Sequence, residues 1–170
     1  MNVETVRTLF AYNRWANERT LASVAQIPEG DLFRELPSSF GSIHATLTHS
    51  IGAEWAYVQR WAGASPRALP KPKEYPDLAS LREFWQTILG DQARFLGGLR
   101  EERLPQPMTY INFQGDPFTY SLNDQIQQMV NHSTYHRGQV TIMQRLVGAT
   151  PVQTDYLLYL DLLNSGELKH

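Results

Sequence analysis

Apolar side chains recur every three or four residues in four long stretches of the chain, as in amphipathic helices. These stretches cover residues 3–26, 42–61, 77–100 and 121–148. A shorter stretch with the same spacing covers residues 153–164. The pattern therefore predicts an all-α chain with four long helices and a short C-terminal helix.

Local signals place the helix ends. Ser42 and Ser121 are the expected N-caps of the second and fourth helices, and Gly148 ends the fourth. Residues 29–40 are expected to form a connector, and residues 63–76, which contain four prolines, a loop. Such a long crossover can span a bundle from end to end, so helices 2 and 3 need not be antiparallel neighbours.

Residues 105–120 have a different character. Two short β-rich runs, 108–113 and 117–120, flank a turn that contains Gly115. We expect a small β-hairpin just before the fourth helix. It would either form a lid or wall beside a site or simply connect two helices.

Polar residues interrupt the apolar stripe of the first helix. Asn13, Asn17 and Thr20 fall on that stripe, where buried polar groups need hydrogen-bond partners. Two interpretations stay open. Either this helix faces something hydrophilic at one level, or these side chains cap or bridge neighbouring helices.

The second helix presents His49 on a face of otherwise small residues, an arrangement that would let a neighbouring helix approach closely. That face comprises Ser42, Ala45, Thr46, His49, Gly52, Ala53 and Ala56. His44 projects about 140° away around the helix, too far to share a site with His49. We therefore interpret His44 as a first-turn or surface histidine.

The fourth helix carries a second candidate group. His132 and His136 are four residues apart, so both imidazoles lie on one helix face and can bind one transition metal ion. The same face is polar where leucine would be usual: Gln125, Gln128, Met129, His132, Tyr135, His136, Gln139 and Met143. Together with His49, the pair would give three nitrogen ligands and leave coordination positions open. The competing interpretation is a metal-free bundle whose histidines are hydrogen-bonded within the protein.

Composition narrows the chemistry. The 170 residues suit one domain spanning 1–170, and the absence of cysteine restricts any metal to nitrogen and oxygen ligands. The net charge of −2 and scattered basic residues give no reason to expect nucleic acid. No run of 18 apolar residues suggests a membrane span, and the N-terminus lacks the features of a signal peptide, so a cytoplasmic protein is expected. His170, the last residue of the sequence, is not a candidate ligand.

Four segments carry a resemblance to a known family. They are residues 9–17 (LFAYNRWAN), 43–49 (IHATLTH), 131–139 (NHSTYHRGQ) and 148–155 (GATPVQTD). With these segments the sequence resembles the DinB/YfiT-like family of metal-dependent enzymes over nearly its whole length.

The resemblance implies a four-helix bundle, commonly a homodimer, with a divalent metal on one histidine of the second helix and two of the fourth. In this sequence those are His49, His132 and His136, the same three residues that the helix faces select. Relatives in this family include thiol-dependent transferases and a thiol-dependent isomerase. The resemblance therefore also implies a low-molecular-weight thiol as a co-substrate. Three imidazoles suit zinc, nickel, iron or manganese.

The expected mechanism uses the metal itself. Ser133 follows His132, so the glutamate base of a His-Glu-x-x-His site is absent, and Glu54 projects about 140° away from His49. We expect the ion to activate water or a thiol for attack on a small-molecule substrate, in a thiol-transferase-like or hydrolase-like reaction. Tyr135, Asn13 and Gln128 are candidates for orienting the substrate, and no catalytic residue is assigned. The alternative is a non-enzymatic, metal-binding dimeric module for stress response or interaction.

One glycine bears on packing. Gly138 lies inside the fourth helix, where glycine costs about 1 kcal/mol relative to alanine. We expect a close helix contact at this position to explain the glycine.

Overall fold

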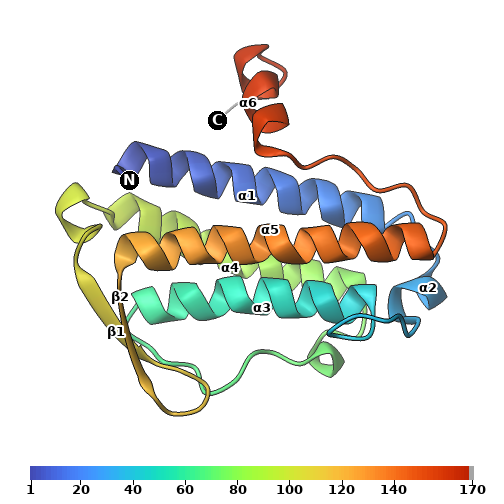
Figure 1. The fold of residues 1–170 in the computed structure, drawn as a ribbon, viewed down its shortest axis with the longest axis horizontal. Helices are drawn as coiled ribbons and strands as arrows, with labels where there is room; N and C mark the ends of the chain where they lie inside the picture. Colours follow the sequence, from blue (N-terminus) through green and yellow to red (C-terminus); the bar gives the residue numbers. More distant parts are fainter. Residues whose placement is uncertain (169–170) are drawn as a thin grey trace.

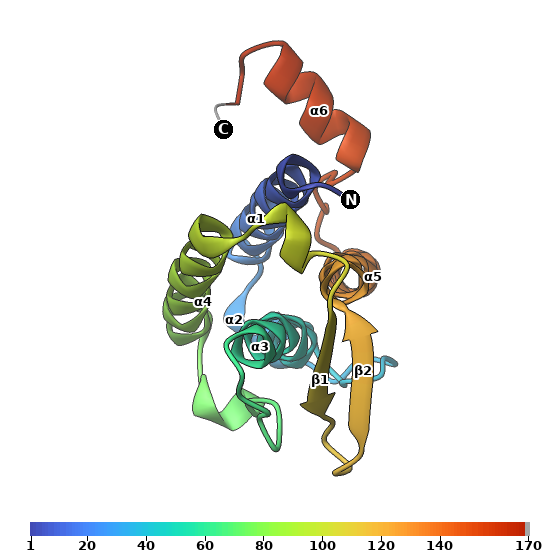
Figure 2. The same ribbon diagram turned by 90° about the vertical axis from the view of Figure 1, so that its left-hand side faces the viewer.

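The computed structural model describes residues 1–168, and four long helices form its body (Figure 1). They are α1 (Val3–Val24), α3 (Ile43–Trp61), α4 (Leu78–Gly98) and α5 (Leu122–Leu146). Seen end on in Figure 2, α1 and α3 lie at opposite corners of the bundle, with α4 and α5 at the other two. The predicted all-α four-helix bundle is confirmed.

The helix ends form where the capping residues predict them. Ser42 accepts a hydrogen bond from the amide of Ala45, and Ser121 accepts one from the amide of Asp124. At the far end of α5, Gly148 adopts a positive φ of 81°, a conformation that L side chains rarely adopt.

The crossover between α3 and α4 returns along the bundle, so these two adjacent helices run in the same direction (Figure 1). It contains the short 3₁₀ helix η1 (Pro72–Glu74). Pro70 of the crossover packs on Gly52 of α3, where an added Cβ would lie only 3.0 Å from the proline Cδ. One small residue of the His49 face therefore makes room for the crossover.

The remaining elements are short. The predicted hairpin is confirmed as β1 (Pro107–Ile111) paired antiparallel with β2 (Pro117–Ser121), and the C-terminal helix as α6 (Tyr156–Asn164). A single 3₁₀ turn, η2 (Glu101–Arg103), joins α4 to the hairpin. The expectation of a plain connector over 29–40 was wrong in part, because α2 (Glu29–Phe33) forms there and buries Leu32.

Aromatic side chains fill much of the core between α1, α3 and α4. The rings of Trp61 and Phe95 stack with their centroids 4.7 Å apart, and Phe10 lies 6.0 Å from Trp61. These contacts fix α3 against its neighbours and so fix the direction of the residues that α3 presents to α5. Within residues 1–168, no helix is both long and apolar enough to span a membrane.

The expectation that another helix packs closely against Gly138 is wrong. Gly138 is exposed, and a Cβ built there meets no atom within 4 Å. Packing therefore does not explain this glycine.

Candidate metal centre

Three imidazoles converge between α3 and α5. The Nε2 atom of His132 lies 3.3 Å from Nε2 of His49 and 3.1 Å from Nε2 of His136. One ligand atom from each of the three residues lies within 4.8 Å of the other two. The predicted trio is thus brought together, with His132 and His136 one turn apart on α5 and His49 facing them from α3.

The spacing of these nitrogens fits coordination of one ion. Two imidazole nitrogens at 2.0–2.1 Å from zinc in tetrahedral geometry would lie about 3.3–3.4 Å apart. The observed separations of 3.3 and 3.1 Å are close to that value. The donor set of three imidazoles suits zinc and other first-row divalent ions.

Gln139 orients one of the three rings. Its Oε1 accepts a hydrogen bond from Nδ1 of His136 at 2.7 Å, one turn along α5. Because Nδ1 then carries the proton, Nε2 of neutral His136 presents a lone pair toward the other two rings. An outer hydrogen bond of this kind typically holds a metal-binding histidine in position.

Counting protons shows that three neutral imidazoles cannot satisfy the hydrogen-bonding capacity of all three Nε2 atoms among themselves. With a lone pair on His136, one proton on Nε2 of His132 could be donated to His136 or to His49. Whichever tautomers His132 and His49 adopt, at least one Nε2 atom is therefore left without a hydrogen-bond partner within the trio. A single cation would satisfy all three lone pairs at once.

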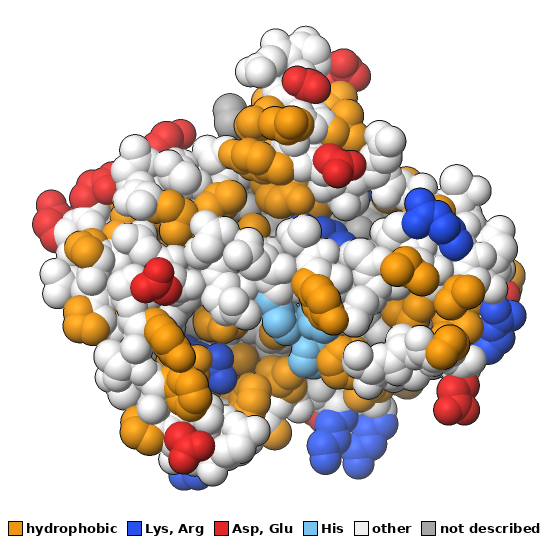
Figure 3. Space-filling model, in the orientation of Figure 1, with side chains coloured by type: hydrophobic (Ala, Val, Ile, Leu, Met, Phe, Trp, Pro, Cys, Tyr) orange, Lys and Arg blue, Asp and Glu red, His pale blue; other side chains and the backbone are white. Residues whose placement is uncertain are grey.

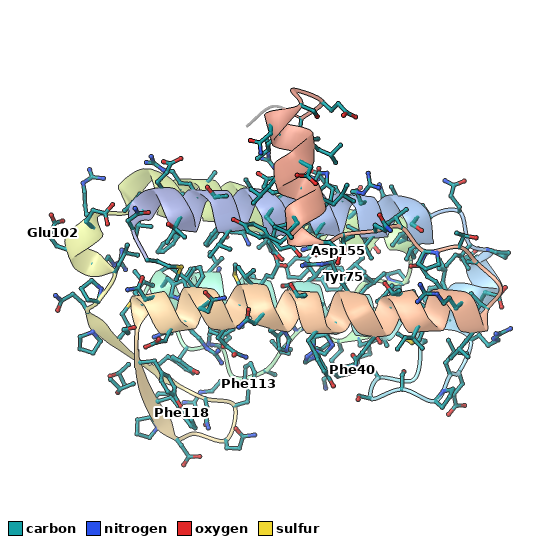
Figure 4. All side chains as sticks on the ribbon, turned by 45° about the horizontal axis from the view of Figure 1, so that its top comes forward. Phe40, Tyr75, Glu102, Phe113, Phe118 and Asp155 are labelled. Carbon is teal, nitrogen blue, oxygen red and sulfur yellow. The ribbon has the colours of Figure 1, made fainter. Side chains whose placement is uncertain are left out.

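The surroundings keep the rings neutral. Burial, together with the neighbouring His136, lowers the pKa of His49 to about 4. Burial and both neighbouring histidines lower the pKa of His132 to about 4, and burial also lowers the pKa of His136. Phe40, which is labelled in Figure 4, stacks on His49 with ring centroids 4.0 Å apart and adds to this desolvation. Three unprotonated imidazoles at neutral pH are the form that binds a metal.

His44 lies apart from the trio, as the helix geometry predicts. It is in the first turn of α3 but is buried against Phe33, so the surface interpretation was wrong. Burial lowers the pKa of His44, partly opposed by backbone hydrogen bonds. His170 lies outside the described residues.

The candidates for orienting a substrate have different positions. Tyr135 is 64% exposed, and its ring lies edge-on to His136 with centroids 5.1 Å apart. Gln128 lines a neighbouring hollow of about 390 Å³ under the hairpin. Asn13 is not at the site, because it is buried in a separate hydrogen-bond network.

That network joins Glu54 of α3 to Arg137 of α5 through two asparagines of α1. Asn13 and Asn17 each donate to Oε1 of Glu54, at 2.8 and 2.7 Å, and each accepts from Nη1 of Arg137, at 2.7 and 2.9 Å. Ser133 also donates to Glu54 at 2.8 Å. The polar stripe of the first helix therefore bridges neighbouring helices, the second of the two interpretations, and Thr20 bonds its own helix backbone.

A hollow opens beside the three histidines. It has a volume of about 130 Å³, and its walls come from α3, α5, the crossover and the hairpin turn: His49, Ala53, Ala56, Tyr57, Arg60, Leu69, Phe113 and His132. Ala53 and Ala56, two of the small residues on the His49 face, leave room for it. Figure 3 shows the histidines at the margin of a recess on this side of the molecule.

The sequence interpretation missed three parts of this region. It did not assign Gln139 to His136, although a spacing of three residues on one helix would allow the contact. It did not pair Glu54 with Arg137, since the two meet only through a third helix. It also overlooked Arg60, because the hairpin residues that surround it are about fifty positions away in the sequence.

Comparisons with known proteins agree with this architecture. The sequence model described as "DinB family" matches residues 1–167. Protein DinB of Bacillus subtilis (strain 168) is 29% identical over 157 residues, which cover 89% of this chain and 91% of that protein.

Solved structures share the fold. A DinB-like protein from Bacillus cereus ATCC 10987 superposes with a TM-score of 0.66 at 15% identity, over 89% of this chain and 97% of the other. A conserved protein from Enterococcus faecalis gives a TM-score of 0.62 at 16% identity, over 86% and 98% of the two chains.

Proposed function

The chain belongs to the DinB family, and we propose that it is a metal-dependent enzyme whose divalent ion is held by His49, His132 and His136. The observation that carries this proposal is the convergence of three Nε2 atoms, two pairs of which are 3.3 and 3.1 Å apart. Zinc, nickel, iron and manganese all suit the ligands.

When bound, such an ion would supply Lewis acidity and lower the pKa of water or of a low-molecular-weight thiol at an open position. The protein's own residues would prepare the site. Gln139 holds His136 in the tautomer that exposes Nε2, and Phe40 shields His49 from water. The reaction class proposed is attack by the activated thiol or water on a small electrophile, as in a thiol S-transferase or a hydrolase.

The hollow beside the histidines favours an enzyme over a structural metal site. A structural site is closed by four protein ligands, whereas two of these three histidines, His49 and His132, border a hollow of about 130 Å³. In the alternative, a non-enzymatic metal-binding module, the ion would hold the bundle together. The core packing and the Glu54 network do not involve the histidines, so we expect the metal-free protein to stay folded.

The test of activity uses metal-loaded protein with a panel of thiols, and water alone, against alkyl halide, epoxide and ester electrophiles. Activity that is present in the wild type and lost in His132→Ala is the expected result. If metal-loaded protein turned over none of these pairs, the transferase and hydrolase proposal would lose its support. Circular dichroism after chelation then tests the alternative, which requires unfolding.

We also propose that the protein is a homodimer. Helix α6 projects from the bundle (Figure 2), and its Leu157 is 71% exposed. Figure 3 shows hydrophobic side chains gathered on α6. A second copy of this chain would cover this surface.

Light scattering coupled to size exclusion should give twice the 19.5 kDa chain mass for the wild type. Leu157→Glu should shift the mass toward a monomer, whereas Leu69→Glu, on the crossover, should not. A wild-type monomer at every concentration would contradict the proposal.

A further inference from the structure

Arg60 is a buried cation near the C-terminal end of α3. The residue is only 8% exposed. Its guanidinium carbon lies 4.0 Å from the ring centroid of Tyr110, 5.1 Å from that of Phe113 and 5.2 Å from that of Tyr57. One helix residue and two hairpin residues thus form an aromatic cage around the charge.

Within residues 1–168, no carboxylate forms an ion pair with this charge. The buried Nε of Arg60 also has no hydrogen-bond partner there. Arg137 is similarly buried and its Nε is also unpartnered, but its Nη1 and Nη2 donate hydrogen bonds to Asn13, Asn17, Tyr12 and Thr134. A charge removed from water is costly unless it is paired.

The aromatic cage compensates only part of that cost. Cation–π contacts stabilise a guanidinium through its electrostatic attraction to the ring faces. The N–H donors of the guanidinium lie in its plane and still require acceptors such as a carboxylate or phosphate, which the planar fork matches in a bidentate manner. Within residues 1–168 the Arg60 guanidinium makes no hydrogen bond, so its N–H groups are free to bind an acceptor from outside the protein.

Arg60 lines the same hollow as the histidines. His49, Ala53, Ala56 and Arg60 are spaced 4, 3 and 4 residues apart and share one face of α3, and all four line that hollow. At 1.5 Å per residue, the Cα atoms of His49 and Arg60 are about 16 Å apart along the helix axis. The cation and the imidazoles therefore belong to different ends of one site.

We propose that Arg60 binds a carboxylate or phosphate group at the end of the substrate that lies away from the histidines. The anionic site itself rests on the geometry of Arg60, and its role in substrate binding rests on the proposed function. The substrate is then an elongated, anionic small molecule. Its reacting end lies at His49 and His132, and its middle part packs on Tyr57 and Phe113.

The test is made on metal-free protein, so that no anion can bind through an ion. Phenylacetate and phenyl phosphate are titrated by calorimetry, and phenylacetamide serves as the uncharged probe of matched shape. Comparing the affinities for phenylacetate and phenyl phosphate shows whether the site prefers a carboxylate or a phosphate. Wild-type protein should bind at least one of the two anions, and bind it at least tenfold more tightly than the amide.

Arg60→Gln should weaken anion binding at least tenfold, and Arg60→Lys should restore part of it. The matched control is Arg103→Gln, since Arg103 also stacks over an aromatic ring, that of Phe95, but lies outside this hollow. Equal binding of the amide, equal binding by Arg60→Gln, or no anion binding by the wild type would each overturn the proposal.

A second readout does not depend on folding of the Gln variant. The Nε–Hε NMR signal of Arg60 in wild-type protein, assigned with Arg60→Lys, should shift on addition of the bound anion, and the Arg103 signal should not. An unmoved Arg60 signal under saturating anion would overturn the proposal. Metal binding by the histidines is measured separately, so a protein that takes up no metal but binds anions at Arg60 refutes only the proposed function.

Discussion

Two polar clusters lie side by side between α3 and α5, and they differ in how completely their hydrogen bonds are made. His132 lines the hollow together with His49, while the neighbouring residues Ser133 and Arg137 of α5 are buried in the core. Glu54 accepts hydrogen bonds from Asn13, Asn17, Ser133 and Gln92, whereas the three histidine Nε2 atoms have only one another.

This difference separates a structural role from a ligand-binding one. The Glu54 carboxylate of α3 is paired with side chains from α1, α4 and α5, so the network links the four long helices without a ligand. The histidine trio leaves at least one Nε2 atom without a partner, and two of its members, His49 and His132, border a hollow. Polar residues on a helix face occur in both structural and ligand-binding clusters. The two kinds of cluster differ in whether the hydrogen-bond donors and acceptors within the cluster can pair with one another.

The largest expected effect comes from breaking the Glu54 network. Glu54→Ala removes the acceptor of several buried donors and leaves the Arg137 charge uncompensated, so it should destabilise the protein by about 3–5 kcal/mol. Urea unfolding of metal-free protein measures this. Glu83→Ala, an exposed substitution on α4, should change the free energy of unfolding by less than about 0.5 kcal/mol. Equal effects of the two substitutions would show that the network contributes nothing.

The next effect concerns the residue that orients His136. Gln139→Leu keeps the side-chain size but removes the acceptor for Nδ1, so metal affinity should fall about 10–100-fold, or about 1.4–2.7 kcal/mol. Competition with a chromogenic chelator measures it. Gln127→Leu, on the exposed side of α5, should leave the affinity unchanged. Unaltered affinity in Gln139→Leu would mean that His136 needs no orienting partner.

A smaller effect is expected outside both clusters. Gly138 is exposed within α5 and has open space at its missing Cβ, so Gly138→Ala should stabilise the protein by up to about 1 kcal/mol. Chemical denaturation with and without metal provides the measurement. A loss of stability would instead indicate a contact that Gly138 makes with another molecule, for example the second copy in a dimer.

The smallest expected effect is the number of protons that the three histidines release when a metal binds, which should be close to zero. Three imidazoles with the ordinary pKa of 6.5 would together carry about two protons at pH 6 and release them on binding a metal. With pKa values of about 4, His49 and His132 are already neutral at that pH, and the lowered pKa of His136 acts in the same direction. Calorimetry at pH 6 in buffers of different ionisation enthalpy should therefore show well under one proton released. Release of about two protons would contradict the desolvated site.

The sequence predicts most of the helix boundaries because their signals are local. Ser42, Ser121 and Gly148 act within one turn of the helix end that they define. Helix α2 was missed because five residues give too short a stretch for an apolar period to be recognised. The hairpin was predicted, but its position over Arg60 depends on the packing of the whole bundle.

In the candidate site, too, local sequence spacing predicts some residues, whereas others are brought together only by the folded structure. His132 and His136 follow from spacing on one helix, and His49 follows from its isolation among small residues. The hollow and the cage around Arg60 do not follow from the sequence, because Tyr110 and Phe113 approach α3 only after the chain has folded. Asn13 was assigned to the wrong cluster for a similar reason, since its partners Glu54 and Arg137 come from two other helices.

The most direct test of the central claim is the metal content of the purified protein beside that of His132→Ala and His44→Ala. Each protein is loaded with zinc, freed of excess metal by gel filtration and analysed by mass spectrometry of the elements. We expect about one ion per chain in the wild type and in His44→Ala, and little in His132→Ala. A His132→Ala protein that holds as much zinc as the wild type, or a wild type that holds none, would contradict a metal site built from His49, His132 and His136.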